Sequence, residues 1–210
     1  MKAGNLGWVV AASLFAVAAT AGFQSGIKIG IVDGAKVFND SDYVKGQLDN
    51  LRALGASRQQ MLDFADANKT FTNEQATKYH DLSLKDPATF TAADKAELDT
   101  IKKSVEAASN RLGVLQQKQN PSDAENIELQ QLSNEIKATT ALLQRWRQAA
   151  QDEFDTAREK VKKDGTDRVR ETIKQVGSGG AYTIVFSADI APYGANDLTD
   201  ATLKAMNSKK

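Results

Sequence analysis

The sequence predicts an α+β protein in which the two chain ends build one small β body and the long middle forms a projecting antiparallel helical hairpin. Strand-like alternation of apolar residues occurs near both ends, at 27–32 and 182–187, and helical periodicity fills the chain between them. No second β-rich segment is apparent there. We therefore expect the body to comprise residues 22–40 and 177–210, and the helical arm to comprise residues 41–176.

Residues 1–21 have the pattern of a secretory signal peptide. Lys2 precedes an apolar run from Trp8 to Ala19, and Ala19-Thr20-Ala21 is a small-x-small site of the kind that signal peptidase accepts. The run is too short to span a bilayer as a stop-transfer helix. We expect cleavage after Ala21 and export of the mature chain, with an uncleaved amino-terminal anchor as the alternative.

The composition limits the classes of partner. The chain has 27 basic and 27 acidic residues and a net charge of zero, so no global field attracts it to nucleic acid or to anionic lipid. We expect no nucleic-acid partner, and membrane-surface contact has no support from net charge. The chain has no cysteine, so burial alone must hold the fold. Its low aromatic content, 7%, and its 26% of charged residues suit long solvated helices.

The body core is expected where the two strands and the last helix bring apolar side chains together. Isoleucines repeat at every second position of the first strand, which predicts that one face of the strand is strongly buried. Tyrosine, isoleucine and phenylalanine repeat in the same way near the carboxyl end. Strands so distant in sequence but alike in pattern should pair with each other. The predicted body core consists of Ile27, Ile29, Ile31, Val37, Phe38, Tyr182, Ile184, Phe186, Leu198 and Leu203.

The arm is predicted from apolar residues that alternate in steps of three and four, which is the seam of a coiled coil. Helices are expected from Ser41 to about Asn68, from Ala92 to about Gln119, and from Ser122 to about residue 176. The first two together match the length of the third. This arithmetic favours a hairpin with its tip at Asn120-Pro121, whereas a tip near Pro87 would leave the outgoing arm too short.

Caps and breaks refine this hairpin. Thr91 with Asp94, and Ser122 with Glu125, have the spacing of capping boxes. Gly165 interrupts the return helix at a cost of about 1 kcal/mol. Residues 69–91, which include a short helix starting near Thr72, are expected to bulge from the outgoing arm as an insertion.

Two motifs, one at each end of the chain, carry a family resemblance. The first has a strand ending in Val-Asp, then Val-Phe, a polar helix start, Val-Lys and spaced leucines. The second has a Tyr-x-Ile-Val strand, a later tyrosine, Asp-Leu-Thr, Leu-Lys and Asn. In order and register both are similar to the Skp/OmpH family of periplasmic chaperones, while the helical middle is similar only in kind. The matching residues are Ile31-Val32-Asp33, Val37-Phe38, Ser41, Val44-Lys45, Leu48 and Leu51, and then Tyr182, Ile184-Val185, Tyr193, Asp197-Leu198-Thr199, Leu203-Lys204 and Asn207.

The resemblance implies a periplasmic homotrimer shaped like a jellyfish, with a shared β body and three arms around a cavity. It further implies an ATP-independent holdase that receives unfolded outer-membrane proteins in that cavity. The alternative is a structural coiled-coil protein of the envelope, trimerised through the same body. The middle is longer than is typical for the family, and the chain is neutral where members are often basic. We therefore carry over no lipopolysaccharide-binding site.

Aromatic side chains on the arm are candidates for client contact. Phe71, Tyr79 and Phe90 lie in the insertion, where client contact and local packing are both open interpretations. Trp146 and Phe154 are expected seam residues. A trimer is required for this function, because many weak contacts around one client add up through effective concentration.

Other motifs are expected to carry no chemistry. His80 is the single histidine and has no matched carboxylate spacing, so we expect no metal site. The glycine-rich run 177–180 leads from helix into strand, the reverse of a phosphate loop. Asp33 is expected to cap a turn, and with no pair of nucleophile and base we expect neither an enzyme nor a cofactor. The basic run 158–170 is interleaved with acids, which favours a solvated face over a membrane-facing patch.

Overall fold

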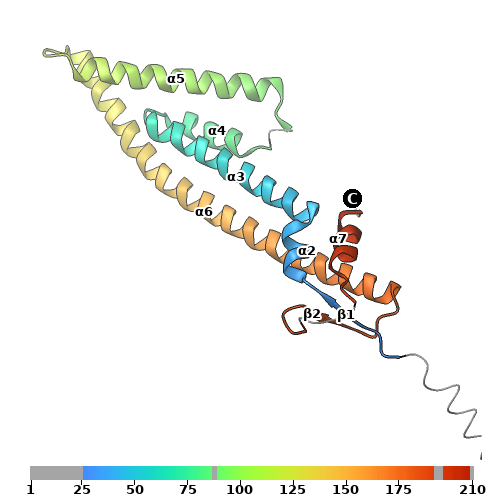
Figure 1. The fold of residues 1–210 in the computed structure, drawn as a ribbon. Helices are drawn as coiled ribbons and strands as arrows, with labels where there is room; N and C mark the ends of the chain where they lie inside the picture. The colour runs from blue at the N-terminus through green and yellow to red at the C-terminus, as the bar shows by residue number, and fades with distance from the viewer. Residues whose placement is uncertain (1–25, 87–88, 192–195, 209–210) are drawn as a thin grey trace, which may run out of the picture. The chain divides into compact units, whose positions relative to one another are not determined.

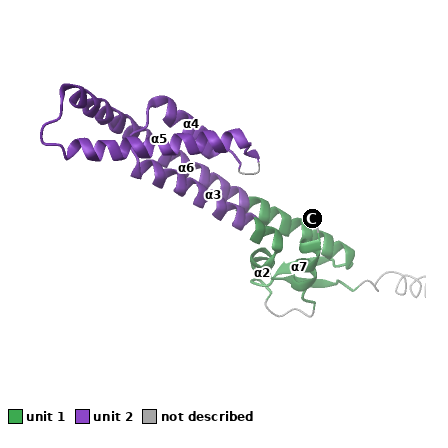
Figure 2. Cartoon of the chain, turned by 90° about the horizontal axis from the view of Figure 1, so that it is seen from above, with its two compact units in different colours: residues 1–46, 162–210 green, residues 47–161 purple. Residues whose placement is uncertain are grey.

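The computed structural model describes residues 26–86, 89–191 and 196–208. Within these ranges the chain forms six helices and two short strands (Figure 1). It divides into two compact units, of which unit 1 is residues 1–46 and 162–210 and unit 2 is residues 47–161 (Figure 2). The predicted signal peptide and Tyr193 lie outside the described residues. The elements are β1 (Ile29–Val32), α2 (Gly34–Asp40), α3 (Asp42–Ala67), α4 (Asn73–Leu84), α5 (Ala92–Gln116), α6 (Asp123–Gly179), β2 (Ile184–Ser187) and α7 (Thr199–Ser208).

Unit 1 contains the sheet, which joins the two ends of the described chain. Strands β1 and β2 pair in parallel, with Ile29 opposite Ile184 and Ile31 opposite Phe186. A parallel pair requires a long crossover between its strands, and the helical middle of the chain supplies it. The predicted pairing of the two sequence-distant strands is therefore confirmed. The compact unit also includes residues 41–46 and 162–176, which the sequence had assigned to the arm.

Short polar contacts close unit 1 around β1. The Asp33 side chain accepts a hydrogen bond from the Lys36 backbone N–H at 2.8 Å and caps α2, as expected. Its own backbone N–H donates to the Thr199 hydroxyl at 2.9 Å, which ties the start of α2 to the start of α7. At the other end of α7, the Asn207 side-chain oxygen accepts from the Asp42 backbone N–H at 3.0 Å. Helix α7 is thus fixed at both ends against the amino-terminal segment.

The core of unit 1 differs in part from the predicted one. Residues Ile31, Val37 and Leu198 are buried, but Ile27 is 70% exposed, and Ile29 and Ile184 are each 43% exposed. A Cβ atom at Gly30 would lie 2.7 Å from Leu198 Cδ1 and 3.1 Å from the Tyr182 ring. At its start β1 therefore packs the Gly30 face against its neighbours. Of the three isoleucines predicted to share one buried face, Ile31 is buried within the chain, and burial of Ile27 and Ile29 between chains stays a prediction. Phe38, Tyr182, Phe186 and Leu203 are half-buried.

Gly165 lies in this core and has a packing role. Helix α6 continues through it without a break, and the residue is buried. A Cβ atom there would lie 2.5 Å from Phe38 Cε2 and 3.1 Å from Val44 Cγ2. The absence of a side chain therefore lets Phe38 and Val44 approach the backbone of α6. The intrinsic cost of glycine in a helix is accompanied by this close contact.

Unit 2 has one hydrophobic core shared by α3, α4, α5 and α6. The segment 69–91, expected to bulge away, instead contributes directly to this core: Phe71 and Tyr79 are each 1% exposed. The Tyr79 hydroxyl donates to the Met61 carbonyl at 3.0 Å. Its ring lies 5.1 Å from that of Phe71. The prediction of a bulge is wrong. Burying these two aromatic rings between the helices removes their apolar surface from water, which stabilises the packed arrangement over an exposed one. The core consists of Met61, Leu62, Ala65, Phe71, Ala76, Tyr79, Leu82, Ile101, Val105, Leu143 and Trp146.

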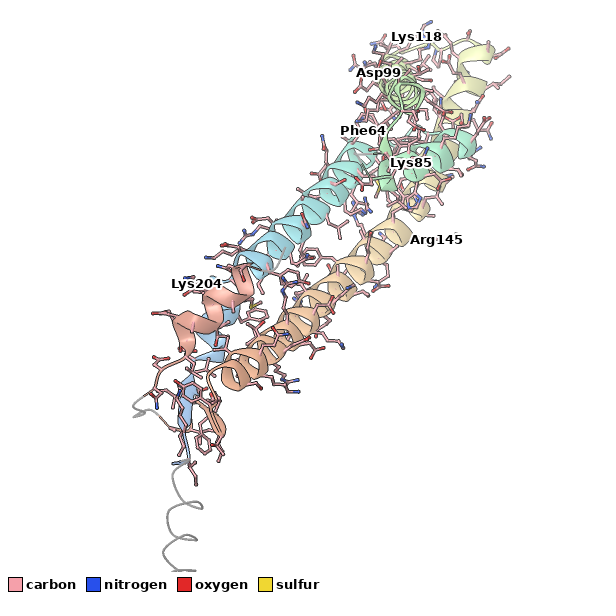
Figure 3. The ribbon with its side chains drawn as sticks, turned by 90° about the vertical axis from the view of Figure 1, so that its right-hand side faces the viewer. Phe64, Lys85, Asp99, Lys118, Arg145 and Lys204 are labelled. Atoms are coloured by element: carbon pink, nitrogen blue, oxygen red, sulfur yellow. The ribbon has the colours of Figure 1, made fainter. Side chains whose placement is uncertain are left out.

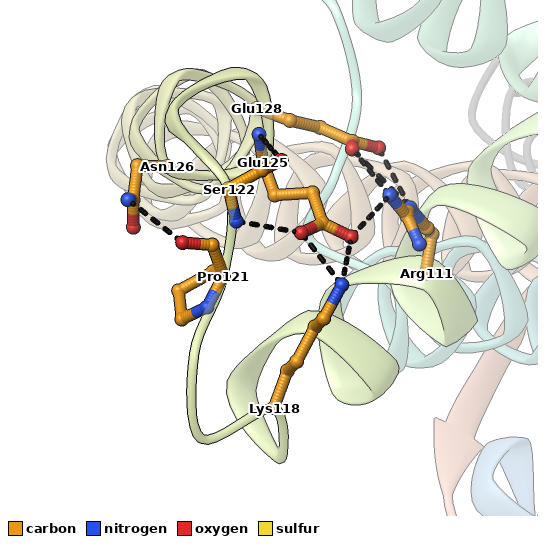
Figure 4. Close-up of polar contacts among 7 residues, drawn as sticks. All are labelled: Arg111, Lys118, Pro121, Ser122, Glu125, Asn126 and Glu128. Carbon is orange, nitrogen blue, oxygen red and sulfur yellow. Dashed lines mark hydrogen bonds and ion pairs between the residues drawn. The ribbon is translucent and has the colours of Figure 1, made fainter.

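The connection between α5 and α6 is a short turn through residues 117–122 that is fixed by ion pairs (Figure 4). The Ser122 N–H donates to the Glu125 carboxylate at 2.8 Å, and the Glu125 N–H donates to the Ser122 hydroxyl at 3.3 Å, which completes the expected capping box. Lys118 also contacts Glu125, at 2.7 Å, and Arg111 binds Glu128 at 2.8 Å. The Lys118 ammonium, together with the Ser122 contacts, lowers the pKa of Glu125 to about 2.

Candidate functional site

The described residues offer two kinds of surface with the character of a binding site. One is a group of exposed isoleucines on the sheet of unit 1, and the other is a groove in unit 2. The described residues contain no group of three or more possible metal ligands among histidines, cysteines and acids. None of the described helices combines the length and the apolar character needed to cross a bilayer.

The isoleucine patch consists of Ile27, Ile29 and Ile184, all of them at least 43% exposed. Ile29 and Ile184 are direct neighbours across the parallel pair. Lys28, on the opposite face, turns back to donate to the Gly180 carbonyl at 2.7 Å and lies 4.1 Å from the centre of the Tyr182 ring. The patch is therefore apolar, because the Lys28 ammonium is bound to Gly180 and Tyr182 and does not lie among the isoleucines. Exposed, contiguous apolar surface of this type marks an interaction site.

The small size of the sheet adds to this argument. A pair of strands is marginally stable in water unless further strands or a helix cover it. Here each strand has four residues, and Leu198, the residue before α7, packs against Gly30 on one side of β1. Ile29 and Ile184, which pair with each other across the two strands, remain exposed. Its geometry suits contact with further apolar surface.

The groove of unit 2 lies where α3, α4 and α5 meet, and has a volume of about 370 Å³. Its apolar floor includes Met61, Tyr79 and Leu98, with half-buried Phe90 at one side. Lysines stand along the rim. The complete lining, which we call the lysine-rimmed groove, is Ser57, Gln60, Met61, Tyr79, Ser83, Lys85, Phe90, Lys95, Leu98 and Lys102.

The aromatic residues singled out in the sequence have different environments. Phe71 and Tyr79 are buried in the core of unit 2, so local packing accounts for both. Phe90 lines the lysine-rimmed groove and is the one of these three that has a half-exposed side chain. Trp146 belongs to the core and Phe154 packs close to Gly55, 3.2 Å from its ideal Cβ position. Both therefore occupy positions between helices.

His80 and the basic run 158–170 make contacts within the chain that account for them without a binding role. The His80 ring stacks on Trp146 with centroids 4.9 Å apart and an angle of 22° between the planes. In the basic run, Lys163 and Arg170 both contact Asp167, at 2.9 and 3.7 Å. These ion pairs are exposed and lie within one helix, so each contributes little to stability. Most of the run is a solvated face of α6, but Arg168 is half-buried and lies 4.2 Å from the centre of the Tyr43 ring.

Sequence reasoning missed the lysine-rimmed groove. The signal was present in part, because Lys95, Leu98 and Lys102 are spaced three and four residues apart and so share one face of α5. What the sequence did not provide was the fold of 69–91, which brings Tyr79 and Phe90 to that face. Figure 3 shows Lys85 and Phe64 among the side chains of this unit.

Comparison with protein families gives a match along nearly the whole described chain. The family model described as "Outer membrane protein (OmpH-like)" matches residues 28–206. Neither the curated proteins nor the solved structures give a significant match. The matched range includes the amino-terminal motif, the carboxyl-terminal motif except Asn207, and the entire helical middle.

Proposed function

The chain belongs to the OmpH-like outer membrane protein family, and on this premise we propose that it is an ATP-independent holdase that binds unfolded outer-membrane proteins in the periplasm. The family is one of non-enzymatic periplasmic chaperones for outer-membrane proteins. We carry the export step, the holdase activity and the client class to this chain as parts of the proposal. The observation that carries it is the family match over 28–206, together with the pairing of Ile29 with Ile184.

The working form is a homotrimer in this proposal. The isoleucine patch supports it, because an exposed apolar strand pair gains most by packing against copies of itself. The body of 22–40 and 177–210 acts as the trimerisation domain. Three arms, formed from residues 41–176, then surround one client in a shared cavity. Reversible holding follows from the number of weak contacts around the client rather than from one tight site.

The proposal is tested by holding activity and mass together. A urea-unfolded outer-membrane protein is diluted into buffer with the mature chain at one trimer per client and no nucleotide, and aggregation is followed by light scattering. We expect suppression by the wild type and a solution mass of three chains. The double substitution Ile29→Lys and Ile184→Lys should give a monomer without activity. Ile127→Lys is the matched control, since Ile127 is 68% exposed in unit 2.

Two outcomes contradict the proposal. A stable, well-folded wild-type monomer contradicts the trimer. A trimer that leaves client aggregation unchanged contradicts the holdase, and favours the structural coiled-coil protein of the envelope that the sequence left as the alternative.

A further inference from the structure

The lysine-rimmed groove has a distribution of charge that selects its ligand. Of the described residues that line it, three are lysines and none is acidic. Lys85 is already paired with Asp94 at 2.6 Å, and this contact, with those of Thr91, lowers the pKa of Asp94 to about 2. Lys85 therefore adds little net charge to the rim.

Lys95 and Lys102 retain their charge toward the groove. No carboxylate of the described residues lies within ion-pair distance of either. Two acids lie between them on α5: Glu97 contacts Lys78 at 3.1 Å, and Asp99 contacts Lys103 at 2.6 Å. The Lys102 ammonium instead lies 5.3 Å from the centre of the Phe64 ring. Two ammonium groups, neither with an ion-pair partner of its own among the described residues, thus flank an apolar floor.

The floor between them is suited to a large apolar side chain. Tyr79 and Met61 are buried and held by the hydrogen bond between them, so the base of the groove is rigid. Phe90 and Leu98 are half-buried and present apolar surface at its sides. A volume of about 370 Å³ is at the small end of ligand-binding pockets, and it is sufficient for one or two bulky side chains of a peptide.

We propose that the lysine-rimmed groove binds short segments of unfolded polypeptide in which a large apolar side chain is flanked by carboxylates. The inference rests on the proposed holdase function and specifies its substrate class. Phe90 and Leu98 contact the apolar side chain, while Lys95 and Lys102 pair with the carboxylates on either side. Both contacts lie at the surface, so binding is weak and reversible, as a holdase requires.

The test uses two fluorescent peptides, each with a central pair of phenylalanines. The residues that flank this pair are aspartates in one peptide and lysines in the other. Binding to the full mature chain is measured by anisotropy. We expect the aspartate peptide to bind about tenfold more tightly, the effect of two exposed ion pairs, and the difference to shrink as salt is raised. The double substitution Lys95→Glu and Lys102→Glu should reverse the preference.

Matched controls separate the groove from general surface charge. Lys137→Glu combined with Lys174→Glu makes the same change of charge at two exposed positions of α6 outside the groove, and should leave the preference unchanged. Phe90→Ala should weaken both peptides about fivefold, whereas Ile127→Ala, at an exposed apolar position, should weaken neither. Circular dichroism of each variant establishes that it is folded. The lysine variants keep the test decisive if Phe90→Ala does not fold.

Several results would overturn the inference. Equal binding of the two peptides does so, as does a preference that survives Lys95→Glu with Lys102→Glu. Vesicles of phosphatidylglycerol that bind in a Lys95-dependent way, with no peptide binding, would assign the groove to a lipid surface. A change of solution mass on Phe90→Ala would make it a contact between copies. If the wild type suppresses client aggregation but shows no peptide preference, the holdase stands and this inference alone fails.

Discussion

Two glycines of unit 1 should respond in opposite ways to the same substitution. Both lie inside helices, Gly46 in α3 and Gly165 in α6. A Cβ atom at Gly46 meets nothing within 4 Å, whereas one at Gly165 meets Phe38 at 2.5 Å and Val44 at 3.1 Å. Alanine is the better helix former by about 1 kcal/mol. Gly46→Ala should therefore raise the free energy of unfolding by about that amount.

At Gly165 the same gain is opposed by overpacking. Val44 is 0% exposed, so it has no free space to move into, and excess volume in a packed core costs about 1 to 3 kcal/mol. The net effect of Gly165→Ala should be a loss of about 0 to 2 kcal/mol. The two variants should then differ by about 1 to 3 kcal/mol, which corresponds to several degrees in Tm for a chain of this size.

The measurement is thermal and urea unfolding followed by circular dichroism, at one protein concentration because association would shift the midpoints. Phe38→Leu, combined with Gly165→Ala, should recover part of the loss, since it removes the ring carbon that the new methyl group meets. Equal stabilisation by Gly165→Ala and Gly46→Ala would refute the packing argument.

Three further substitutions have defined outcomes. Glu125 has its pKa lowered to about 2 from 4.5, so its contribution is present above pH 4.5 and is lost as the pH falls toward 2; Glu125→Gln should remove this acid dependence, as seen in unfolding midpoints between pH 5 and 2. Tyr79→Phe removes a buried hydrogen bond to a main-chain carbonyl and should cost about 1 kcal/mol in urea unfolding. The Arg58 guanidinium donates two hydrogen bonds to the Glu153 carboxylate, at 2.7 and 2.9 Å, and the Arg58 side chain is 11% exposed. Arg58→Lys should lower Tm, because an ammonium group cannot make this two-nitrogen contact. Glu153→Gln should lower Tm less than Arg58→Met does.

The elements with local signals could be predicted from the sequence. Asp33 caps α2, and the two capping boxes that begin with Thr91 and Ser122 are present, because a cap depends on residues three positions apart. The pairing of Ile29 with Ile184 was also predictable, because the sequence offers neither strand another strand-like segment to pair with.

The features that depend on three-dimensional packing could not be predicted. From the sequence, Phe71 and Tyr79 could have faced either solvent or a core. They are buried because α4 packs against α5. The burial of Gly30 could not be predicted, because the residue that packs against it, Leu198, is about 170 residues away in sequence. The lysine-rimmed groove combines side chains from three helices, so no single stretch of sequence contains its pattern.

The parallel pairing of β1 with β2 determines the order in which parts of the chain can fold during synthesis. The strand at residues 29–32 cannot pair until its partner at 184–187 is available, so the body is completed only when the last part of the polypeptide has been made. The helices between them form early from local contacts, and loop closure grows only slowly more costly with length. A chain that stops short of β2 and α7 would keep its helices but leave β1 unpaired, and it would be recognisable to proteases as unfinished.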